Sequence, residues 1–287
     1  MRDFEDKVVA ITGAASGIGR ALALDLAGRG SRLAVADLDE TGLAETVLRA
    51  KRRGVEVTSR RLDVADRDSV HSWADEVVAD HGRVNVIVNN AGVALGATVE
   101  AMAYSDLEWL MGINFGGVVS GTKAFLPHLK ATGEGHIVNI SSIFGLIGIP
   151  SQSAYNAAKF AVRGFTESLR LELDLERCGV SATAIHPGGI KTNIARNARI
   201  DDSVRRVGGV DALETQRDFE KMFITTPEKA AAQIIRAVQL NKRRALVGPD
   251  AHVFNLMAHL PPGVYQRLVA RGARRSIKDR AIEARAR

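Results

Sequence analysis

The sequence predicts an α/β fold in which a parallel sheet of about seven strands carries helices on both faces. Three observations lead to this prediction. Short apolar runs rich in Val and Ile alternate with longer helical patterns. A glycine-rich turn separates the first strand from the first helix. Polar residues cluster where the apolar runs end, which is where doubly wound sheets bind ligands.

The strands are expected, in chain order, at residues 7–11, 32–36, 55–59, 84–88, 136–140, 180–185 and 245–247. Helices are expected after Gly19, over 67–80, over 105–131 and over 153–177. A further helix should begin after Thr226, with Thr as N-cap and Pro227 in its first turn. Because strands and helices alternate, the crossovers should be right-handed and the strands parallel.

The first strand runs directly into the segment TGAASGIG, residues 12–19. Glycines between a strand and a helix allow a tight turn, a close approach of the backbone to a pyrophosphate, and close packing of helix on strand. The helix N-terminus offers unpaired N–H groups to the phosphates. The alternative is an ordinary glycine-rich connector. The strand–turn–helix context favours a dinucleotide site.

Asp37 ends the second strand, 18 residues after Gly19. This is close to the spacing of about 20 residues at which an acidic residue binds the adenosine ribose of NAD. A carboxylate would repel the additional phosphate of NADP, so NAD is the preferred cofactor. The alternative role of Asp37 is a helix N-cap, which Asp39 could also fill.

Ser142, Tyr155 and Lys159 form a third pattern, with Ser142 lying 13 residues before Tyr155. Tyr155 and Lys159 are four residues apart and would share one face of a helix. A lysine ammonium should favour the phenolate and lower the tyrosine pKa. Taken alone, such a pair is more often an ordinary surface pair. A serine hydroxyl that holds the reacting oxygen would complete an acid/base group for interconverting an alcohol and a carbonyl.

Taken together, these motifs resemble the single-domain type of the short-chain dehydrogenase/reductase family, which has a Rossmann-like sheet. The matching segments lie within residues 7–192: TGAASGIG (12–19), Asp63 in LDV, NNAG (89–92), Asn114 in INF, Ser142, YNAAK (155–159) and HPGGIKT (186–192). Each segment is weak evidence alone, but their common order is specific. The resemblance implies a homodimer or homotetramer.

The resemblance assigns a catalytic group of Asn114, Ser142, Tyr155 and Lys159. It implies cofactor contacts from Thr12, Gly13, Ser16, Gly17, Ile18, Gly19, Asp37, Asp63, Val64, Asn90, Ala91, Gly92, Tyr155, Lys159, Pro187, Gly188, Ile190 and Thr192. In relatives, the asparagine holds a water behind the lysine. Alternatives remain: Asn114 could bond a neighbouring backbone group, Asp63 could form a turn, and Thr192 could cap a helix. His186 is interpreted as structural, and no metal is expected.

The expected reaction is NAD(P)-dependent oxidation and reduction at a CH–OH group, between a secondary alcohol and a ketone. Apolar side chains flank the predicted site, which favours a lipophilic, uncharged substrate. They are Val93, Leu95, Phe144, Leu146, Ile147, Ile149 and Ile190. The alternative is that many of them belong to the core. The other functions considered are an NADP-dependent carbonyl reductase, a catalytically idle NAD-binding regulatory protein, and a lyase or epimerase built on the same fold.

Residues 1–250 are predicted to form one domain, with a substrate lid at 193–226 hinged at Gly208-Gly209, and residues 251–287 a helical extension. Cys178 is the single cysteine, so an internal disulfide is excluded and a reducing compartment is favoured. The charged N-terminus and the lack of a long apolar run favour a cytoplasmic location.

Residues 242–287 hold 11 Lys/Arg and 3 Asp/Glu, a net charge of +8 against +6 for the whole chain. The extension has three interpretations: a helix that covers the pocket or a partner subunit, an amphipathic segment in peripheral contact with an anionic membrane, or a frayed terminus. No recognition motif accompanies the charge, so no nucleic-acid partner is expected.

Overall fold

The computed structural model describes residues 3–208, 214, 217 and 223–286, and for 275–286 only the course of the backbone. The hinge expected at Gly208-Gly209 therefore lies partly outside the described residues. Among the described residues, no helix is both long and apolar enough to cross a bilayer.

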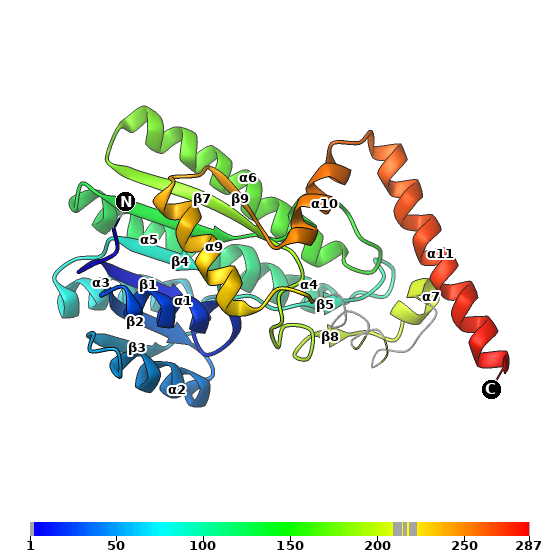
Figure 1. The fold of residues 1–287 in the computed structure, drawn as a ribbon, viewed down its shortest axis with the longest axis horizontal. Helices are drawn as coiled ribbons and strands as arrows, with labels where there is room; N and C mark the ends of the chain where they lie inside the picture. Colours follow the sequence, from blue (N-terminus) through cyan, green and yellow to red (C-terminus); the bar gives the residue numbers. More distant parts are fainter. Residues whose placement is uncertain (1–2, 209–213, 215–216, 218–222, 287) are drawn as a thin grey trace.

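The central sheet has seven parallel strands in the order β3-β2-β1-β4-β6-β7-β9 (Figure 1). The strands are β1 (Val8–Thr12), β2 (Arg32–Asp37), β3 (Val57–Arg61), β4 (Val86–Asn89), β6 (Gly135–Ile140), β7 (Val180–Pro187) and β9 (Arg244–Val247). Strand order reverses between β1 and β4, which opens a crevice at their carboxyl ends. The predicted fold class is confirmed.

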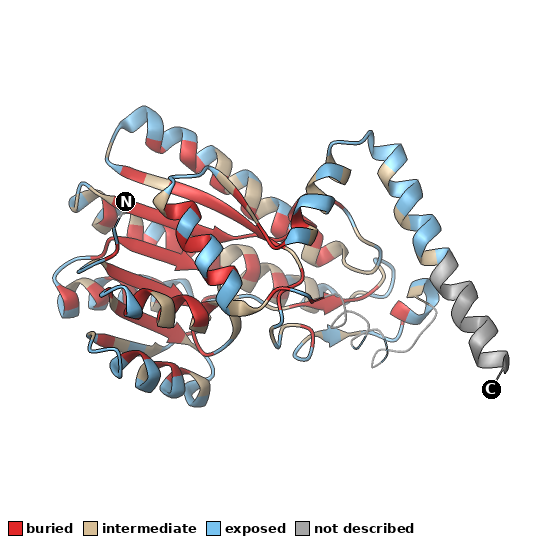
Figure 2. Ribbon diagram, in the orientation of Figure 1, coloured by how far each residue is buried: buried red, intermediate tan, exposed pale blue. Residues whose placement is uncertain are grey.

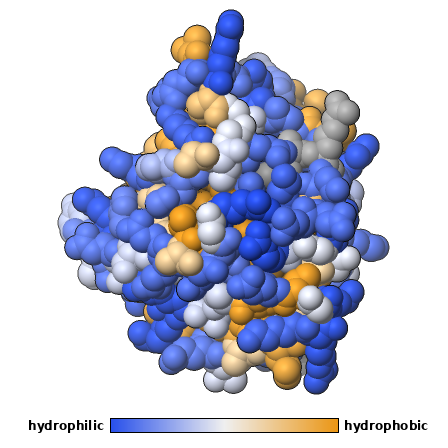
Figure 3. Space-filling view, turned by 90° about the vertical axis from the view of Figure 1, so that its left-hand side faces the viewer, coloured by the Kyte–Doolittle hydropathy of each residue, from blue (hydrophilic) through white to orange (hydrophobic). Residues whose placement is uncertain are grey.

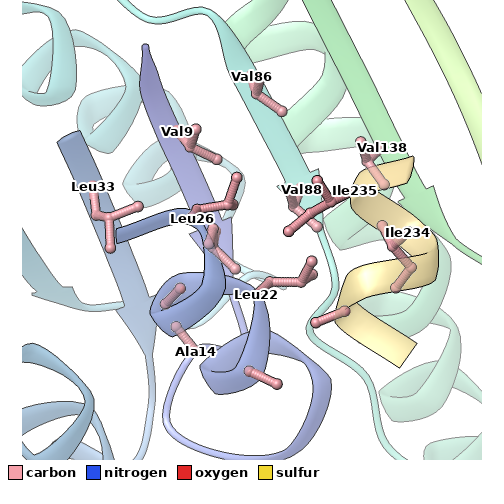
Figure 4. Close-up of a cluster of buried hydrophobic side chains, with 14 of the residues drawn as sticks. Val9, Ala14, Leu22, Leu26, Leu33, Val86, Val88, Val138, Ile234 and Ile235 are labelled. Atoms are coloured by element: carbon pink, nitrogen blue, oxygen red, sulfur yellow. The ribbon is translucent and has the colours of Figure 1, made fainter. Parts of the chain in front are cut away.

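Two apolar layers hold helices on the two faces of the sheet. On one face, α1 (Gly17–Gly28) and α9 (Pro227–Gln239) cover β1 and β4, where Leu22 and Ile234 are buried in one cluster (Figure 4). On the other face lie α3 (Arg67–His81), α5 (Gly117–Ala131) and α6 (Ser153–Glu176). There Trp73 meets Phe125 edge-on at 5.1 Å between ring centroids.

Short polar side chains fix where the helices begin. Asp39 caps α2 (Glu40–Lys51) by accepting the Gly42 N–H at 3.0 Å. Thr226 caps α9, and Pro227 follows in its first turn, as the sequence predicts. Asp66 caps α3 in the same way, and Gly82 ends that helix in the left-handed region at φ 76°.

The helix predicted over 105–131 is not continuous. It consists of α4 (Tyr104–Met111), a π-helical turn over Gly112–Gly116, and α5. A π turn holds an additional residue and is common at functional sites. Its central residue is Asn114, so the interruption falls at a predicted catalytic position.

Two further differences concern short or exposed strands. Strand β3 lies two residues later than predicted, because Val57 is its one apolar residue and the polar residues that follow leave no apolar run to mark the strand. A second sheet pairs β5 (Leu95–Gly96) with β8 (Arg199–Ile200). Two-residue strands are too short to leave a periodic signal in the sequence.

The chain ends in two helices, α10 (Pro249–Ala258) and α11 (Pro262–Ala286). They leave the carboxyl end of the sheet, and α11 runs past α7 (Val204–Gly208) as an arm along this end of the molecule (Figure 1). Their described residues are mostly exposed (Figure 2). The predicted division at residue 250 falls inside α10.

Candidate functional site

A cavity of about 630 Å³ lies at the carboxyl ends of the strands. Its wall runs from the glycine turn and Asp37, past Ser142 and Tyr155, to Phe254 on α10. The site therefore combines the crevice at the switch point of the sheet with side chains from α10.

The glycine turn needs its glycines for space as well as for conformation. Gly13 and Gly17 have φ of +67° and +53°, where other residues are strained. A Cβ on Gly13 would stand 2.8 Å from Ala91 Cα, and one on Gly17 would stand 2.9 Å from Thr192 Cγ2. A Cβ on Gly19 would overlap the Gly13 carbonyl.

Thr12 and Asn90 connect this turn to the end of β4. The Thr12 hydroxyl accepts the N–H groups of Asn90 and Ala91 at 3.0 and 3.1 Å. The Asn90 amide donates to the carbonyls of Thr12 and Gly13 at 3.0 and 3.1 Å. The two residues thus hold the adjoining loops in one arrangement.

Asp37 stands at the edge of the cavity and is half-buried. Its carboxylate accepts the N–H groups of Ala15 and Asp39 at 2.8 and 3.0 Å. Asp39, rather than Asp37, caps the following helix. The capping alternative for Asp37 is therefore wrong, and its carboxylate faces the cavity.

The N-terminus of α1 also borders the cavity. Ser16 occupies the N-cap position but makes no side-chain capping hydrogen bond. Ser16, Gly17 and Ile18 line the wall at this point. This helix end, together with the glycine cradle, suits an anionic group such as a pyrophosphate.

Ser142 and Tyr155 meet at the middle of the cavity. Ser142 follows β6, where its hydroxyl accepts the Phe144 N–H at 3.1 Å. That hydroxyl also hydrogen-bonds the phenol of Tyr155 in the first turn of α6. The Tyr155 ring packs edge-on against Phe144 at 5.9 Å. Two separate segments thus fix the serine–tyrosine pair.

Lys159 lies one turn further along α6 and is buried. Its ammonium donates to the Ile140 carbonyl at 3.0 Å and lies 5.5 Å from the centre of the Tyr155 ring. Burial lowers the pKa of Lys159 to about 8. The group is still mostly cationic at neutral pH.

Burial also raises the pKa of Tyr155 to about 12, and the hydrogen bond from Ser142 only partly opposes this effect. The prediction that Lys159 lowers the tyrosine pKa below its ordinary value is therefore wrong for the protein chain by itself. A phenol with this pKa is protonated at neutral pH, so Tyr155 is poised to donate a proton.

Asn114 is fully buried in the π turn. Its amide oxygen accepts the Val93 N–H at 2.8 Å, and its amide nitrogen donates to the Val93 carbonyl at 2.9 Å. These are the hydrogen bonds to a neighbouring backbone group that the sequence offered as the alternative role of Asn114. Both Asn114 and Lys159 lie against Gly92, so the asparagine supports the loop beside the lysine.

His186 lies behind Ser142. Its Nδ1 is 2.8 Å from the Ser142 carbonyl, which can only accept, so Nδ1 carries the proton. Burial lowers the pKa of His186 to about 4. A neutral, fully buried imidazole bound to the serine backbone agrees with a structural role.

Most predicted site residues come together in the cavity wall. Three lie behind it instead: Thr12, Gly19 and Asn114. These three shape the wall through backbone contacts and close packing. The wall also contains Asp63. Its carboxylate accepts the Ala65 N–H at 2.9 Å, so Asp63 also forms the turn that was its alternative role.

The predicted apolar wall is partly wrong. Leu95, Leu146 and Ile147 are buried in the core, and Ile149 is partly buried beside Phe144; none of these four lines the cavity. Val93, Phe144 and Ile190 do line it. The other apolar wall residues include Ala94, Ile113, Ile143, Ile194, Phe223 and Phe254. Lys159 is the one basic residue among the described wall residues, and the wall on the side of α10 carries the Asp250 carboxylate. This side therefore offers no cation to a carboxylated ligand.

Two polar residues that the sequence interpretation missed hold the loops around the site. Asn156 donates to the carbonyls of Phe144 and Ile147, both at 2.7 Å, and so ties the loop after β6 to α6. Asp250 accepts the Gly189 N–H at 2.6 Å. Asn156 lies inside the YNAAK segment, whereas nothing in the sequence linked Asp250 to Gly189.

The first part of the predicted lid is attached to the body of the domain. Strand β8 pairs with β5, and the Arg199 guanidinium stacks 3.6 Å from the centre of the Trp109 ring. Arg199 also bonds Asp106 at 2.8 Å. Asn193, Ile194 and Asn197 line the cavity, so this segment forms one side of the site.

Comparisons with known proteins agree with this geometry. The family model described as "short chain dehydrogenase" matches residues 7–203. The chain therefore belongs to the short-chain dehydrogenase/reductase family.

Individual relatives extend the likeness beyond the matched residues. The chain is 50% identical to "Putative oxidoreductase SadH" of Mycobacterium tuberculosis, over 95% of this chain and 97% of the relative. A short-chain dehydrogenase/reductase of Burkholderia phymatum, solved with NAD, superposes with a TM-score of 0.82 at 31% identity, covering 90% of this chain and 94% of that one. Levodione reductase superposes with a TM-score of 0.75 at 28% identity, covering 87% and 99%.

Proposed function

We propose that this protein is an NAD(H)-dependent oxidoreductase that interconverts a secondary alcohol and a ketone on a lipophilic, uncharged substrate. The observation that carries the proposal is the contact between Ser142 and Tyr155, with Lys159 beside the ring, inside a cavity that begins at a glycine cradle and ends in apolar side chains.

The wall residues suit NAD(H). Gly13 and Gly17 leave room that a Cβ would fill, and the uncapped N-terminus of α1 suits the pyrophosphate. Asp37 offers carboxylate oxygens to the adenosine ribose and disfavours the phosphate of NADP. The nearby Arg20 is engaged with Glu45 at 2.9 Å and with backbone carbonyls. When bound, the nicotinamide would accept or supply the hydride.

The chain's own residues handle the proton. Ser142 accepts the Phe144 N–H, so its hydroxyl proton can point to Tyr155 or to a substrate oxygen. Tyr155 donates its proton to the oxygen of a ketone during reduction, or takes one from an alcohol during oxidation. Lys159, cationic below a pKa of about 8, stabilises the phenolate that remains.

A panel of secondary alcohols and ketones, assayed with NAD(H) and NADP(H) by nicotinamide absorbance, tests the proposal. We expect turnover with NAD(H) that rises with the apolar size of the substrate and is absent with carboxylated analogues, because the described wall lacks a cation at its substrate end. Preference for NADP(H) would contradict the cofactor assignment. Cofactor binding without any turnover would support an idle binding protein.

A further inference from the structure

The C-terminal helices α10 and α11 present an exposed surface that combines apolar and cationic side chains. On α10, Val253 and Leu256 are 60% and 70% exposed. On α11, Val264 and Leu268 are 43% and 49% exposed. Exposed aliphatic side chains on two consecutive helices are the kind of surface that marks an interaction site with a protein or a membrane. We call Val253, Leu256, Val264 and Leu268, with the arginines below, the arm surface.

The helix α11 has two distinct sides. Tyr265, Val269 and Ala273 recur every four residues and are partly buried. Val264, Leu268, Arg267, Arg271 and Arg274 are exposed and, at 100° per residue, fall within about 120° of the helix circumference. The apolar residues of this outer side therefore lie beside its arginines. This arrangement is typical of helices that rest in a membrane interface, where aliphatic side chains enter the lipid and arginines reach its head groups.

The charge of the arm favours an anionic partner. Residues 262–287 hold 8 Lys/Arg and 2 Asp/Glu, a net charge of +6 that equals the net charge of the whole chain. The rest of the chain therefore has no net charge. A second copy is a poor match for the arm surface, since symmetric pairing would bring two basic arms together and the remaining body offers no net opposite charge.

We propose that the arm surface docks on an anionic lipid membrane. The arm lies at the carboxyl end of the sheet, and Phe254 of α10 lines the cavity while its neighbour Val253 faces outward. Docking through the arm would thus place the bilayer beside the end of the molecule that holds the cavity. The opposite end, where the strands begin, is mostly hydrophilic, with apolar groups near the middle and in the lower part of the face (Figure 3).

Vesicle co-sedimentation of the full-length protein tests the proposal. We expect binding to mixed phosphatidylcholine–phosphatidylglycerol vesicles that weakens with added salt, and little binding to pure phosphatidylcholine. Reversing two charges with Arg267→Glu and Arg271→Glu should weaken binding at least about 30-fold. Replacing two apolar residues with Leu256→Ser and Leu268→Ser should weaken it by about tenfold or more.

The matched control lies on α6. Leu171 and Leu175 are 60% and 84% exposed, but their exposed neighbours are Glu172, Asp174 and Glu176. Leu171→Ser with Leu175→Ser should leave vesicle binding unchanged.

Three outcomes would overturn the proposal: no binding to anionic vesicles, binding that the arm variants leave intact, or equal loss in the α6 control. In a fourth outcome, the parent protein does not bind vesicles, and light scattering gives a lower molar mass for the double variant Leu256→Ser with Leu268→Ser than for the parent. That result would assign the arm surface to a second copy. None of these readouts depends on catalysis.

Discussion

The two ends of the cavity are built in different ways. The cofactor end is held by hydrogen bonds that converge on a few residues, such as the four that join Thr12 and Asn90 to the glycine turn and the end of β4. The substrate end is assembled from the Phe144 loop, the segment after Thr192, and α10. The first end is defined by backbone geometry, and the second by side chains that meet only in the folded protein.

This difference explains which sequence predictions succeeded. The glycine turn, Asp37 and the pair Tyr155–Lys159 lie within short segments, so spacing alone placed them at the cavity. Leu146 and Ile147 resembled wall residues because they flank the site in sequence, but the loop turns them into the core. Phe254 is over 100 residues away from that loop and could not be linked to it by pattern.

The strongest test removes the hydroxyl at the centre of the site. Tyr155→Phe should lower kcat about a thousandfold, or about 4 kcal/mol in activation free energy, because it deletes the proton donor. Cofactor affinity, measured by fluorescence titration, should change little. Tyr104→Phe, at a residue that is 84% exposed, is the control. Near-normal turnover by Tyr155→Phe would remove this residue from the mechanism.

The proposed contact of Asp37 with the ribose can be tested separately from the capping of α2 by Asp39. Asp37→Ala should weaken NAD binding about tenfold to a hundredfold, since it removes charge-assisted hydrogen bonds. It should also reduce the ratio of NAD affinity to NADP affinity. Asp39→Ala, which removes the cap of α2, should leave the ratio of NAD to NADP affinity unchanged. An equal shift of that ratio in both variants would argue against ribose recognition by Asp37. Isothermal titration calorimetry measures both affinities.

Burial of Lys159 should be visible in stability against pH. Its pKa falls from 10.5 to about 8 on folding, so between these values the unfolded chain binds more protons and stability rises with pH. Urea unfolding should show this contribution as a gain of about 2 kcal/mol from pH ~7.5 to ~9.5. Lys159→Met should lose this gain, whereas the exposed Lys123→Met should keep it. Parallel pH profiles for all three proteins would contradict the assignment.

The smallest effect is expected for Asp250, which links α10 to the loop at Gly189. Asp250→Ala should weaken cofactor binding by about tenfold, because the Gly189 N–H loses its charged acceptor at the cavity wall. Asp250→Asn keeps an acceptor oxygen and should weaken binding less. His252→Ala, on the exposed side of the same helix, should have no effect. If both Asp250 variants bind cofactor normally, α10 has no influence on the Pro187–Gly189 loop.

The π turn over Gly112–Gly116 makes the surrounding segment sensitive to chain length. Such a turn contains one residue more than an α-helical turn. Deleting a single residue there would let the turn close into regular α-helix, so Asn114 would lose the position that the wider turn gives it. Replacing an exposed side chain nearby costs only local contacts, whereas a deletion would turn Asn114 away from the Val93 backbone. A library of single-residue deletions in this protein should therefore show that deletions at this point are not tolerated, even though the sequence pattern predicts an ordinary helix here.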